Sequence, residues 1–420
     1  MQSKHVLVWV TPAYAPRLNG IARYAKAHGW HLTIADRLGR SPIGWRGDGA
    51  LTTMRGGDTM SDYVKGLRRR HVPVVDLSFN HPEVRVPRVS GDHAAMGRLA
   101  GEHFRDRNFR HAAWFSTGWL NIHALRYGGF SAAFDNPPAR WVIEENIPTD
   151  QRDDLRIVSK WLGAKLKSAP KPLAVLAYDD ADAARVLTAA LEARLTVPED
   201  IAILGIGGDT LVCENQAVPL SSVEHDQERT GYEGAALLDR LMSATAPRQP
   251  TTLLIPPTGI TVRASSDRMA VSNPILRQAL AYIKENLARS FGAGQIADAL
   301  GCSRATLDRL FQAELGRSVG KEIVRQRIAR AQGLLKNENL SIAQIARETG
   351  FCNQAYLTNT FRATLGCSPR ALRKRISPIH NRGEPSSGPT RPPCTPHRGP
   401  VPSGNSGQNF QFPSTRKSGM

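Results

Sequence analysis

Two groups of polar side chains lie about fifty residues apart near the C-terminal end of the chain, each at the start of a predicted helix. Arginine can give two hydrogen bonds to guanine, and asparagine and glutamine can bond adenine in the same bidentate way. These side-chain types therefore suit recognition of base edges in a DNA major groove. We expect base contacts, with phosphate contacts as the alternative, from Arg304, Thr306, Arg309, Asn353, Gln354 and Asn359.

Each group needs two short helices joined by a tight turn. Gly301 and Gly350 can supply the left-handed backbone of that turn. Ser303 and Asn353 can cap the N–H groups that open the next helix. Apolar pairs at i and i+4 pack the two helices together and leave the outer face free for a major groove: Leu307 with Phe311, and Leu357 with Phe361. The sequence thus predicts two helix-turn-helix motifs, at about 293–314 and 341–363, joined by a helix over 319–335.

The positive charge of the chain is concentrated around these motifs. The net charge is +18, and residues 269–375 hold 17 Lys+Arg against 7 Asp+Glu. Residues 1–268 hold 33 against 29, and residues 376–420 hold 5 against 1. A local excess of this kind is expected for a polyanionic partner. On the joining helix we expect salt bridges or phosphate contacts from Arg325, Arg327 and Arg330.

The first part of the chain alternates short apolar runs with amphipathic stretches, which is typical of parallel α/β sheets with helical crossovers. Eight runs are predicted as strands: 5–10, 31–36, 49–54, 72–78, 111–116, 173–179, 201–207 and 220–226. This number fits two open sheets better than one, with a ligand in the crevice at the carboxyl ends of the strands. We predict a two-lobed α/β domain over 1–268, an all-helical domain over 269–376 and a disordered Pro/Gly/Ser-rich tail over 377–420.

Residues 276–375 resemble the AraC/XylS family of transcription regulators. The resemblance is carried by Ile296-Ala297, Leu300-Gly301, Ile345-Ala346, Gly350-Phe351, Tyr356, Phe361 and the run from Gly366 to Arg373. It implies two helix-turn-helix units in one monomer, which enter successive major-groove segments. Residues 5–265 resemble the periplasmic-binding-like sensor of the LacI/GalR family, through 90–116, 124–130, 176–209, 220–242 and 256–266.

The resemblance to that sensor implies a small neutral sugar as effector, with xylose or a related pentose expected. The ligand residues that it implies are Asp92, Arg126, Asp179 and His225. Asp92 and Asp179 each precede a predicted helix, so a helix cap is the alternative role for both. Four aromatic residues could stack on a sugar or belong to the core: Tyr14, Trp45, Trp119 and Tyr178. One departure from the family is Gly207, which stands where related sensors usually have a carboxylate.

These patterns together predict a sequence-specific, DNA-binding transcription regulator, an activator, that is controlled by a sugar. A regulator that responds to another sugar or small polar metabolite is the alternative. A solute-binding transport protein is a further reading, but it leaves the two motifs unexplained. The expected partners are promoter DNA, the effector, RNA polymerase and a second copy of the chain in a homodimer.

The residue pattern argues against an enzyme. Asp179 and Asp180 are adjacent, so on a strand their side chains would point in opposite directions, which is a poor geometry for paired acid and base. The five cysteines show neither zinc-site nor disulfide spacing. We therefore expect no catalytic residues, no metal and no cofactor. The absence of a long apolar run or an apolar leader predicts a cytoplasmic protein with no membrane partner.

Overall fold

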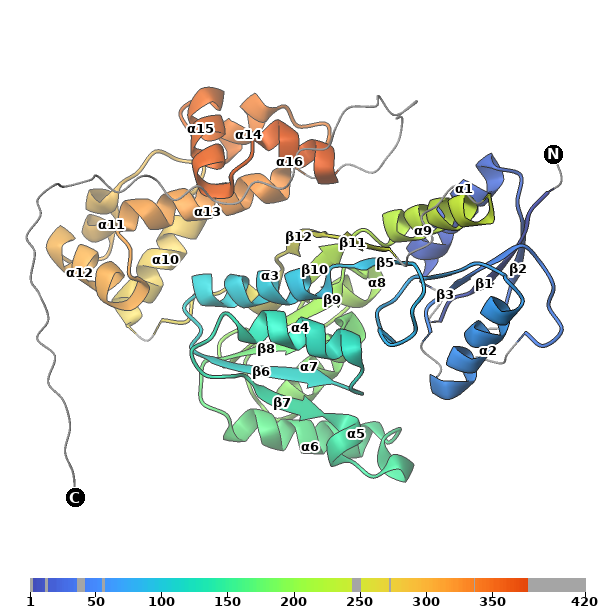
Figure 1. The fold of residues 1–420 in the computed structure, drawn as a ribbon. Helices are drawn as coiled ribbons and strands as arrows, with labels where there is room; N and C mark the ends of the chain where they lie inside the picture. Colours follow the sequence, from blue (N-terminus) through green and yellow to red (C-terminus); the bar gives the residue numbers. More distant parts are fainter. Residues whose placement is uncertain are drawn as a thin grey trace, which may run out of the picture.

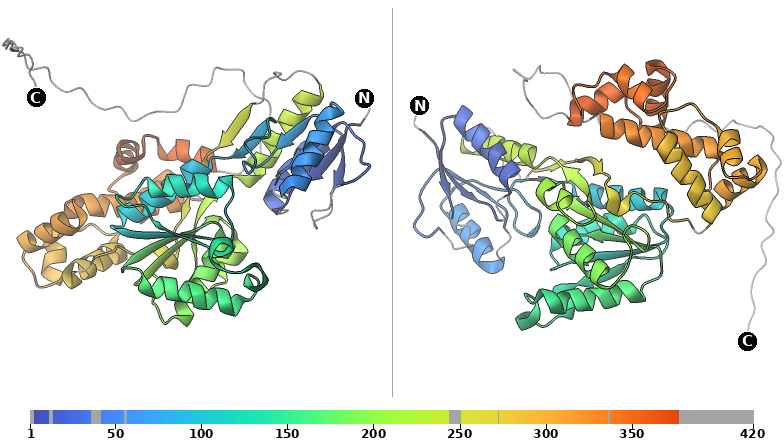
Figure 2. Two further views of the ribbon diagram at one scale, coloured as in Figure 1. Left: turned by 60° about the horizontal axis from the view of Figure 1, so that its bottom comes forward. Right: turned by 180° about the vertical axis from the view of Figure 1, so that it is seen from behind.

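The structure is a computed structural model, and it describes residues 3–11, 14–35, 42–54, 57–243, 251–271, 273–335 and 337–376. It contains two α/β lobes, followed by a domain of helices (Figure 1). All views place the helical domain beside the second lobe and away from the sheet of the first (Figures 1 and 2). The tail over 377–420, for which the sequence predicts disorder, lies outside the described residues.

The N-terminal lobe is a six-stranded parallel sheet in the order β11-β5-β4-β3-β1-β2. Its strands are β1 (His5–Trp9), β2 (His31–Ile34), β3 (Gly49–Thr52), β4 (Val74–Asp76), β5 (Arg88–Gly91) and β11 (Thr252–Ile255). Helices α1 (Ala15–Ala27) and α9 (Gln227–Met242) cover one face, and α2 (Gly57–Arg69) covers the other. The four central strands are almost fully buried because both faces are covered, whereas the edge strands β2 and β11 are largely exposed.

The C-terminal lobe has a second six-stranded sheet, in the order β12-β10-β9-β8-β6-β7, of which only β12 is antiparallel to its neighbour. Its strands are β6 (His111–Ser116), β7 (Ala139–Val142), β8 (Leu173–Ala177), β9 (Ile201–Gly207), β10 (Ser221–His225) and β12 (Pro257–Thr261). Its helices are α3 (His93–Asp106), α4 (Asn121–Ser131), α5 (Ile143–Asn146), α6 (Leu155–Ser168), α7 (Asp180–Glu192) and α8 (Thr210–Glu214). Helices α3 and α4 pack on one face of the sheet, and α6 and α7 pack on the other.

The chain crosses between the lobes three times, from β5 to α3, from β10 to α9 and from β11 to β12. The lobes are thus interleaved in sequence. Residues that follow strands of one lobe can therefore contact helices of the other.

The helical domain has two small cores joined by one long helix. Its helices are α10 (Pro274–Asn286), α11 (Ala293–Ala299), α12 (Arg304–Leu315), α13 (Val319–Leu334), α14 (Ile342–Glu348), α15 (Gln354–Leu365) and α16 (Pro369–Ile376). The first core forms around Ile296, Leu307 and Phe311, and the second around Ile345, Leu357 and Phe361. Helix α13 contributes to both, through Val319 and Ile323 at its start and Ile328 and Ala331 further along.

The predicted fold class is confirmed. All eight runs predicted as strands form strands, and the structure adds β5, β7, β11 and β12. The predicted boundary at residue 268 falls between β12 and α10 and stays a prediction. Within the described residues, no helix is long and apolar enough to cross a membrane.

Candidate functional site

The two helix-turn-helix units have the local geometry that their sequences predict. Gly301 and Gly350 lie in the left-handed region, with φ of 63° and 73°. Ser303 Oγ accepts a hydrogen bond from the Thr306 amide at 3.1 Å. Asn353 Oδ1 accepts one from the Tyr356 amide at 2.8 Å. The apolar pairs are fully buried against α11 and α14, so the opposite faces of α12 and α15 remain exposed.

The six predicted base-reading residues fall into two groups. Three side chains already have local partners: Arg304 lies 3.7 Å from Asp308, Thr306 Oγ1 lies 2.9 Å from Ser303 Oγ, and Asn353 is the α15 cap. The other three are exposed, and among the described residues their side chains have no partner: Arg309, Gln354 and Asn359. Their base-reading role stays a prediction, and these three are the best placed for it.

A cavity of about 650 Å³ lies within the first helix-turn-helix unit, between the start of α11, α12 and the start of α13. Arg304, Asp308 and Gln312 line it, and two of these side chains are exposed. It is therefore an open groove of the helical domain, distant from the ends of the two sheets where the ligand is expected.

Glu322 on α13 connects the first unit to the C-terminal lobe. This carboxylate is fully buried and accepts hydrogen bonds from Arg317 Nε at 2.6 Å and from Arg325 Nη2 at 2.7 Å. Although burial opposes ionisation, the two arginines hold the pKa of Glu322 below its usual range. Arg317 also donates to the carbonyl oxygen of Asp106, the last residue of α3, at 2.9 Å. The salt bridge expected for Arg325 is confirmed.

Two of the four predicted ligand residues act as helix caps. Asp92, directly after β5, accepts from the Ala95 amide at 2.8 Å and caps α3. Asp179, two residues after the end of β8, accepts from the Asp182 amide at 2.8 Å and caps α7. The alternative that the sequence leaves open for these residues is thus realised in the structure. Their contact with a ligand stays a prediction.

Arg126 on α4 is 5% exposed, and its hydrogen-bond partners are neutral. Its Nε donates to His93 Nδ1 at 3.2 Å, its Nη1 donates to the carbonyl oxygen of Tyr178, and its guanidinium lies over the Tyr178 ring. Gly97 permits this placement, because a Cβ at that position would lie 2.0 Å from the Arg126 carbonyl oxygen. Helices α3 and α4 therefore pack backbone to backbone next to Arg126.

A second arginine, Arg17 on α1, reaches the same region from the N-terminal lobe. Its Nε and Nη2 both donate to Gln227 Oε1, at 2.9 and 2.6 Å. The Gln227 amide nitrogen lies 3.0 Å from His225 Nε2. Burial lowers the pKa of Arg17; Tyr14, Tyr178 and the Asp76 carboxylate oppose this effect, and the Arg126 charge adds to it. We call Arg17, His93, Arg126, His225 and Gln227 the inter-lobe cluster.

Both histidines of the inter-lobe cluster are uncharged. Burial lowers the pKa of His225 to about 3, and the charges of Arg126 and Arg17 add to this effect. Burial, followed by the Arg126 charge, also holds the pKa of His93 well below its usual range. The cluster thus contains two cations and no titratable group that would balance them.

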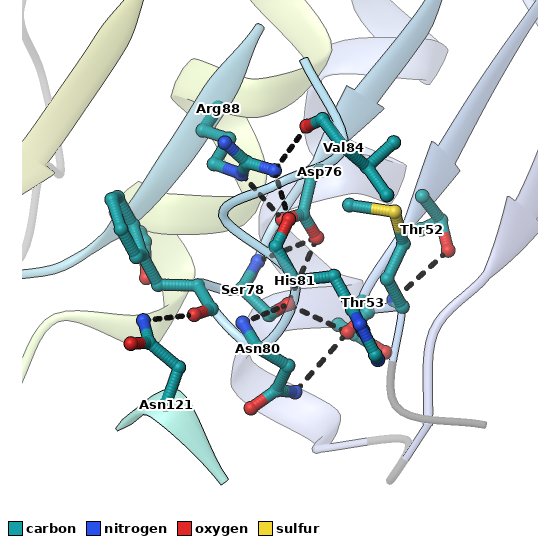
Figure 3. A network of polar contacts seen from close by, with 12 residues as sticks. Thr52, Thr53, Asp76, Ser78, Asn80, His81, Val84, Arg88 and Asn121 are labelled. Atoms are coloured by element: carbon teal, nitrogen blue, oxygen red, sulfur yellow. Dashed lines mark hydrogen bonds and ion pairs between the residues drawn. The ribbon is translucent and has the colours of Figure 1, made fainter. Parts of the chain in front are cut away.

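Beside this cluster, a polar network closes the end of β4 in the N-terminal lobe (Figure 3). Asp76 is fully buried and accepts from Arg88 Nε at 3.0 Å and from Ser78 Oγ at 2.9 Å. Burial raises the pKa of Asp76 to about 6, against the opposing effect of Arg88. Asn121, at the start of α4, donates to the Phe79 carbonyl oxygen at 2.7 Å and so joins the two lobes. Asn80 Oδ1 is buried with no hydrogen-bond partner among the described residues.

The structure thus brings together two of the four predicted ligand residues, Arg126 and His225. It adds three residues that the sequence analysis did not select, Arg17, His93 and Gln227. Gln227 stands two residues after a strand end, and His93 follows the predicted Asp92, so their positions were a usable signal. Arg17 gives no such signal, because a single arginine on an amphipathic helix is usually solvated.

The predicted stacking residues differ in their surroundings. Trp45 is 9% exposed within the N-terminal core, and Tyr178 stacks on His123 at 3.9 Å. Trp119 is partly buried against the C-terminal core, and Tyr14 is 38% exposed. Within the described residues, no group of three or more acidic, histidine or cysteine side chains could hold a metal ion.

Comparisons with known families match both parts of the chain. Residues 102–266 match the family described as periplasmic binding protein-like domain, and residues 296–375 match the helix-turn-helix domain family. The xylose operon regulatory protein of Haemophilus influenzae is 26% identical over 318 residues, which are 74% of this chain and 81% of the relative. Its Escherichia coli K12 counterpart is 29% identical over 340 residues, which are 78% of this chain and 84% of the relative.

Solved structures agree on the fold. The structure described as the xylose-binding transcription activator xylR matches with a TM-score of 0.53 at 22% identity, covering 90% of this chain and 100% of its own. The transcriptional regulator CelR in complex with cellobiose matches with a TM-score of 0.51 at 22% identity, covering 62% of this chain and 84% of its own. At this identity the likeness establishes the fold alone, which is the two-lobed architecture. The match to the xylR structure, which covers 90% of this chain, also includes the helical domain that follows the lobes.

Proposed function

This chain is an AraC-type transcription regulator homologous to the xylose operon regulatory proteins, and we propose that a small sugar controls how it binds promoter DNA. In this proposal the sugar binds between the two lobes. The family consists of regulators and not of enzymes. The observation that carries the proposal is the pair of exposed faces on α12 and α15, within one chain whose other part is a two-lobed α/β domain.

The proposed DNA contacts come from both helix-turn-helix units. Arg309 on α12 and Gln354 and Asn359 on α15 are exposed and without partners among the described residues, so they can bond base edges. Arg304, Thr306 and Asn353 would contact the flanking backbone or bases from the helix starts. Two such helices in one monomer should cover two major-groove segments about 10 bp apart.

The proposed effector site is the inter-lobe cluster together with Asp92 and Asp179. Xylose or a related pentose is the starting candidate, because the relatives that match most of the chain are named for the xylose operon. We further propose that the protein acts as a homodimeric activator in contact with RNA polymerase. A sugar that bridges the lobes would then change the spacing of the DNA-binding units through its different affinities for the open and closed states.

The test is a gel-shift and footprinting experiment on the DNA upstream of the protein's own coding sequence, with and without a panel of pentoses and hexoses. We expect protection of two adjacent major-groove segments per monomer and an affinity that falls steeply with salt. Protection of a single segment per monomer would contradict the proposed arrangement. Light scattering that reports a monomer at concentrations where DNA is bound would contradict the dimer.

A further inference from the structure

The two arginines of the inter-lobe cluster have only neutral hydrogen-bond partners. Arg17 donates to an amide oxygen, and Arg126 donates to an imidazole and a backbone carbonyl. Within the described residues neither forms an ion pair, whereas Arg23, on the same helix as Arg17, lies 2.6 Å from Glu228. Arg126 is 5% exposed and Arg17 is half-buried. A guanidinium without a carboxylate is expensive to bury unless a counter-charge arrives.

The hydrogen bonds themselves require both imidazoles to be neutral. Arg126 Nε can only donate, so His93 Nδ1 accepts and carries no proton. Gln227 Oε1 accepts from Arg17, so its amide nitrogen must donate to His225 Nε2. The proton of the neutral His225 ring is therefore on Nδ1, which is buried and has no partner. The cluster offers two cations and one unused N–H donor.

The carboxylates around the cluster are already engaged elsewhere. Asp76 is paired with Arg88, and Asp92 and Asp179 cap helices whose N-terminal N–H groups offset their charge. Asp180 is 3% exposed and accepts from Ser222 Oγ at 2.6 Å and from the Asp209 amide at 2.8 Å.

The end of β9 supplies no further acid. Gly207 has a φ of 152°, and a Cβ there would lie 2.8 Å from Asp180 Oδ2, so a carboxylate side chain would not fit at this position without a shift. Asp209 accepts from the Val212 amide at 3.2 Å and caps α8.

We propose that the effector of this site is acidic, a sugar-sized molecule whose carboxylate or phosphate group binds between Arg17 and Arg126 and accepts a hydrogen bond from the Nδ1–H group of His225. The inference rests on the proposed function only in placing the effector between the lobes. Arginine forks match the two oxygens of a carboxylate or phosphate, and charge-assisted bonds are about twice as strong as neutral ones. One arginine comes from each lobe, so the anion would join the lobes directly.

Calorimetric titration of the full chain with matched ligands tests the proposal. The probes are D-xylose, D-xylonate and D-xylose 5-phosphate, with inorganic phosphate at constant ionic strength as the minimal anion. We expect at least one of the two acidic sugars to bind tenfold or more tightly than xylose, and phosphate to compete with it. The comparison of xylonate with xylose 5-phosphate distinguishes the carboxylate from the phosphate.

The variants separate the arginine charges from folding. In Arg17→Gln and Arg126→Gln the preference for the acidic sugar over xylose should fall to about twofold or less. Arg126→Lys should retain part of it, because the charge remains. Arg23→Gln is the matched control on α1 and should leave the preference unchanged.

Two results would overturn the inference: xylose binding as tightly as both acids, or neither acidic sugar nor phosphate binding saturably. Melting curves identify any variant that fails to fold. If Arg126→Gln fails to fold, the ligand preference of Arg17→Gln decides the test, because Arg17 is only half-buried. A gel shift on the parent protein distinguishes this inference from the proposed function. If an acid binds with arginine dependence but never changes DNA affinity, the effector role fails while the anion site stands.

Discussion

We expect Glu322→Gln to lower the melting temperature of the helical domain by about 10–20 °C. Glu322 is fully buried and accepts hydrogen bonds from Arg317, Arg325 and Gln326, the last at 2.8 Å. The amide can keep one acceptor but removes the charge that holds two guanidinium groups together. The arginines would then repel each other at the start of α13.

The magnitude follows from the burial of the three side chains. Breaking a buried ion pair by removing one partner costs about 3–5 kcal/mol. Arg317 and Arg325 are 21% and 24% exposed, so water can partly solvate them, and we reduce the expected loss to about 2–3 kcal/mol. In a domain of about 100 residues, each kcal/mol corresponds to about 4–8 °C.

Differential scanning calorimetry of the full chain measures this shift. Glu285→Gln is the matched control, because Glu285 is exposed on α10, and its substitution should change the unfolding free energy by less than about 0.5 kcal/mol. A Glu322→Gln protein that melts within two degrees of the parent would show that the pair contributes no net stability, and the reasoning would fail.

Three further outcomes are expected. Arg309→Ala and Gln354→Ala should each weaken specific DNA binding by about 1–3 kcal/mol while non-specific binding changes little; a proportional loss of both, in gel shifts with specific and random DNA, would identify phosphate contacts instead. Asp179→Ala should lose about 1 kcal/mol of unfolding free energy as a missing cap, whereas Asp179→Asn should keep the cap; if calorimetry shows unchanged effector binding in both, Asp179 is a cap alone. Burial, followed by Arg107 and Arg325, holds the pKa of His103 well below its usual range, so its neutral form stabilises the fold above about pH 6.5 and this contribution is lost as pH falls. We therefore measure the unfolding free energy by denaturant at pH 7.5 and pH 5.5. Between these values the His103→Gln variant should lose about 1 kcal/mol less unfolding free energy than the parent, and equal losses would argue against a buried neutral His103.

The sequence predicts those parts of the fold that depend on local periodicity and on backbone chemistry. The buried parallel strands read as continuous apolar runs, and the two turns are marked by glycines that adopt positive φ. The sequence does not predict β5, because its residues, RVSG, include an arginine and a serine. Arg88 is 5% exposed only because Asp76, on the neighbouring strand, neutralises it, and this pairing cannot be read from a local segment.

The inter-lobe cluster also depends on contacts between distant parts of the chain, which local sequence patterns do not predict. The resemblance to the sensor family implies Asp92 and Asp179 as ligand residues, and their position after strand ends also makes them helix caps. The sequence does not predict the contact between Arg17 and Gln227, because they are 210 positions apart and the α1–α9 packing that brings them together is tertiary. Gly231 permits it, since a Cβ there would lie 2.1 Å from the Arg17 carbonyl oxygen.

One helix links the inter-lobe cluster to the helical domain. α3 begins with His93, which accepts from Arg126, and ends with Asp106, whose carbonyl accepts from Arg317. Because α3 packs on α4 with backbone contacts at Gly97, it has little room to deform and should shift as a unit. A ligand that draws Arg126 toward the N-terminal lobe would therefore move the support of Arg317, and with it the Glu322 pair at the start of α13. Such a ligand can change DNA affinity only as far as it prefers one position of α3 over the other.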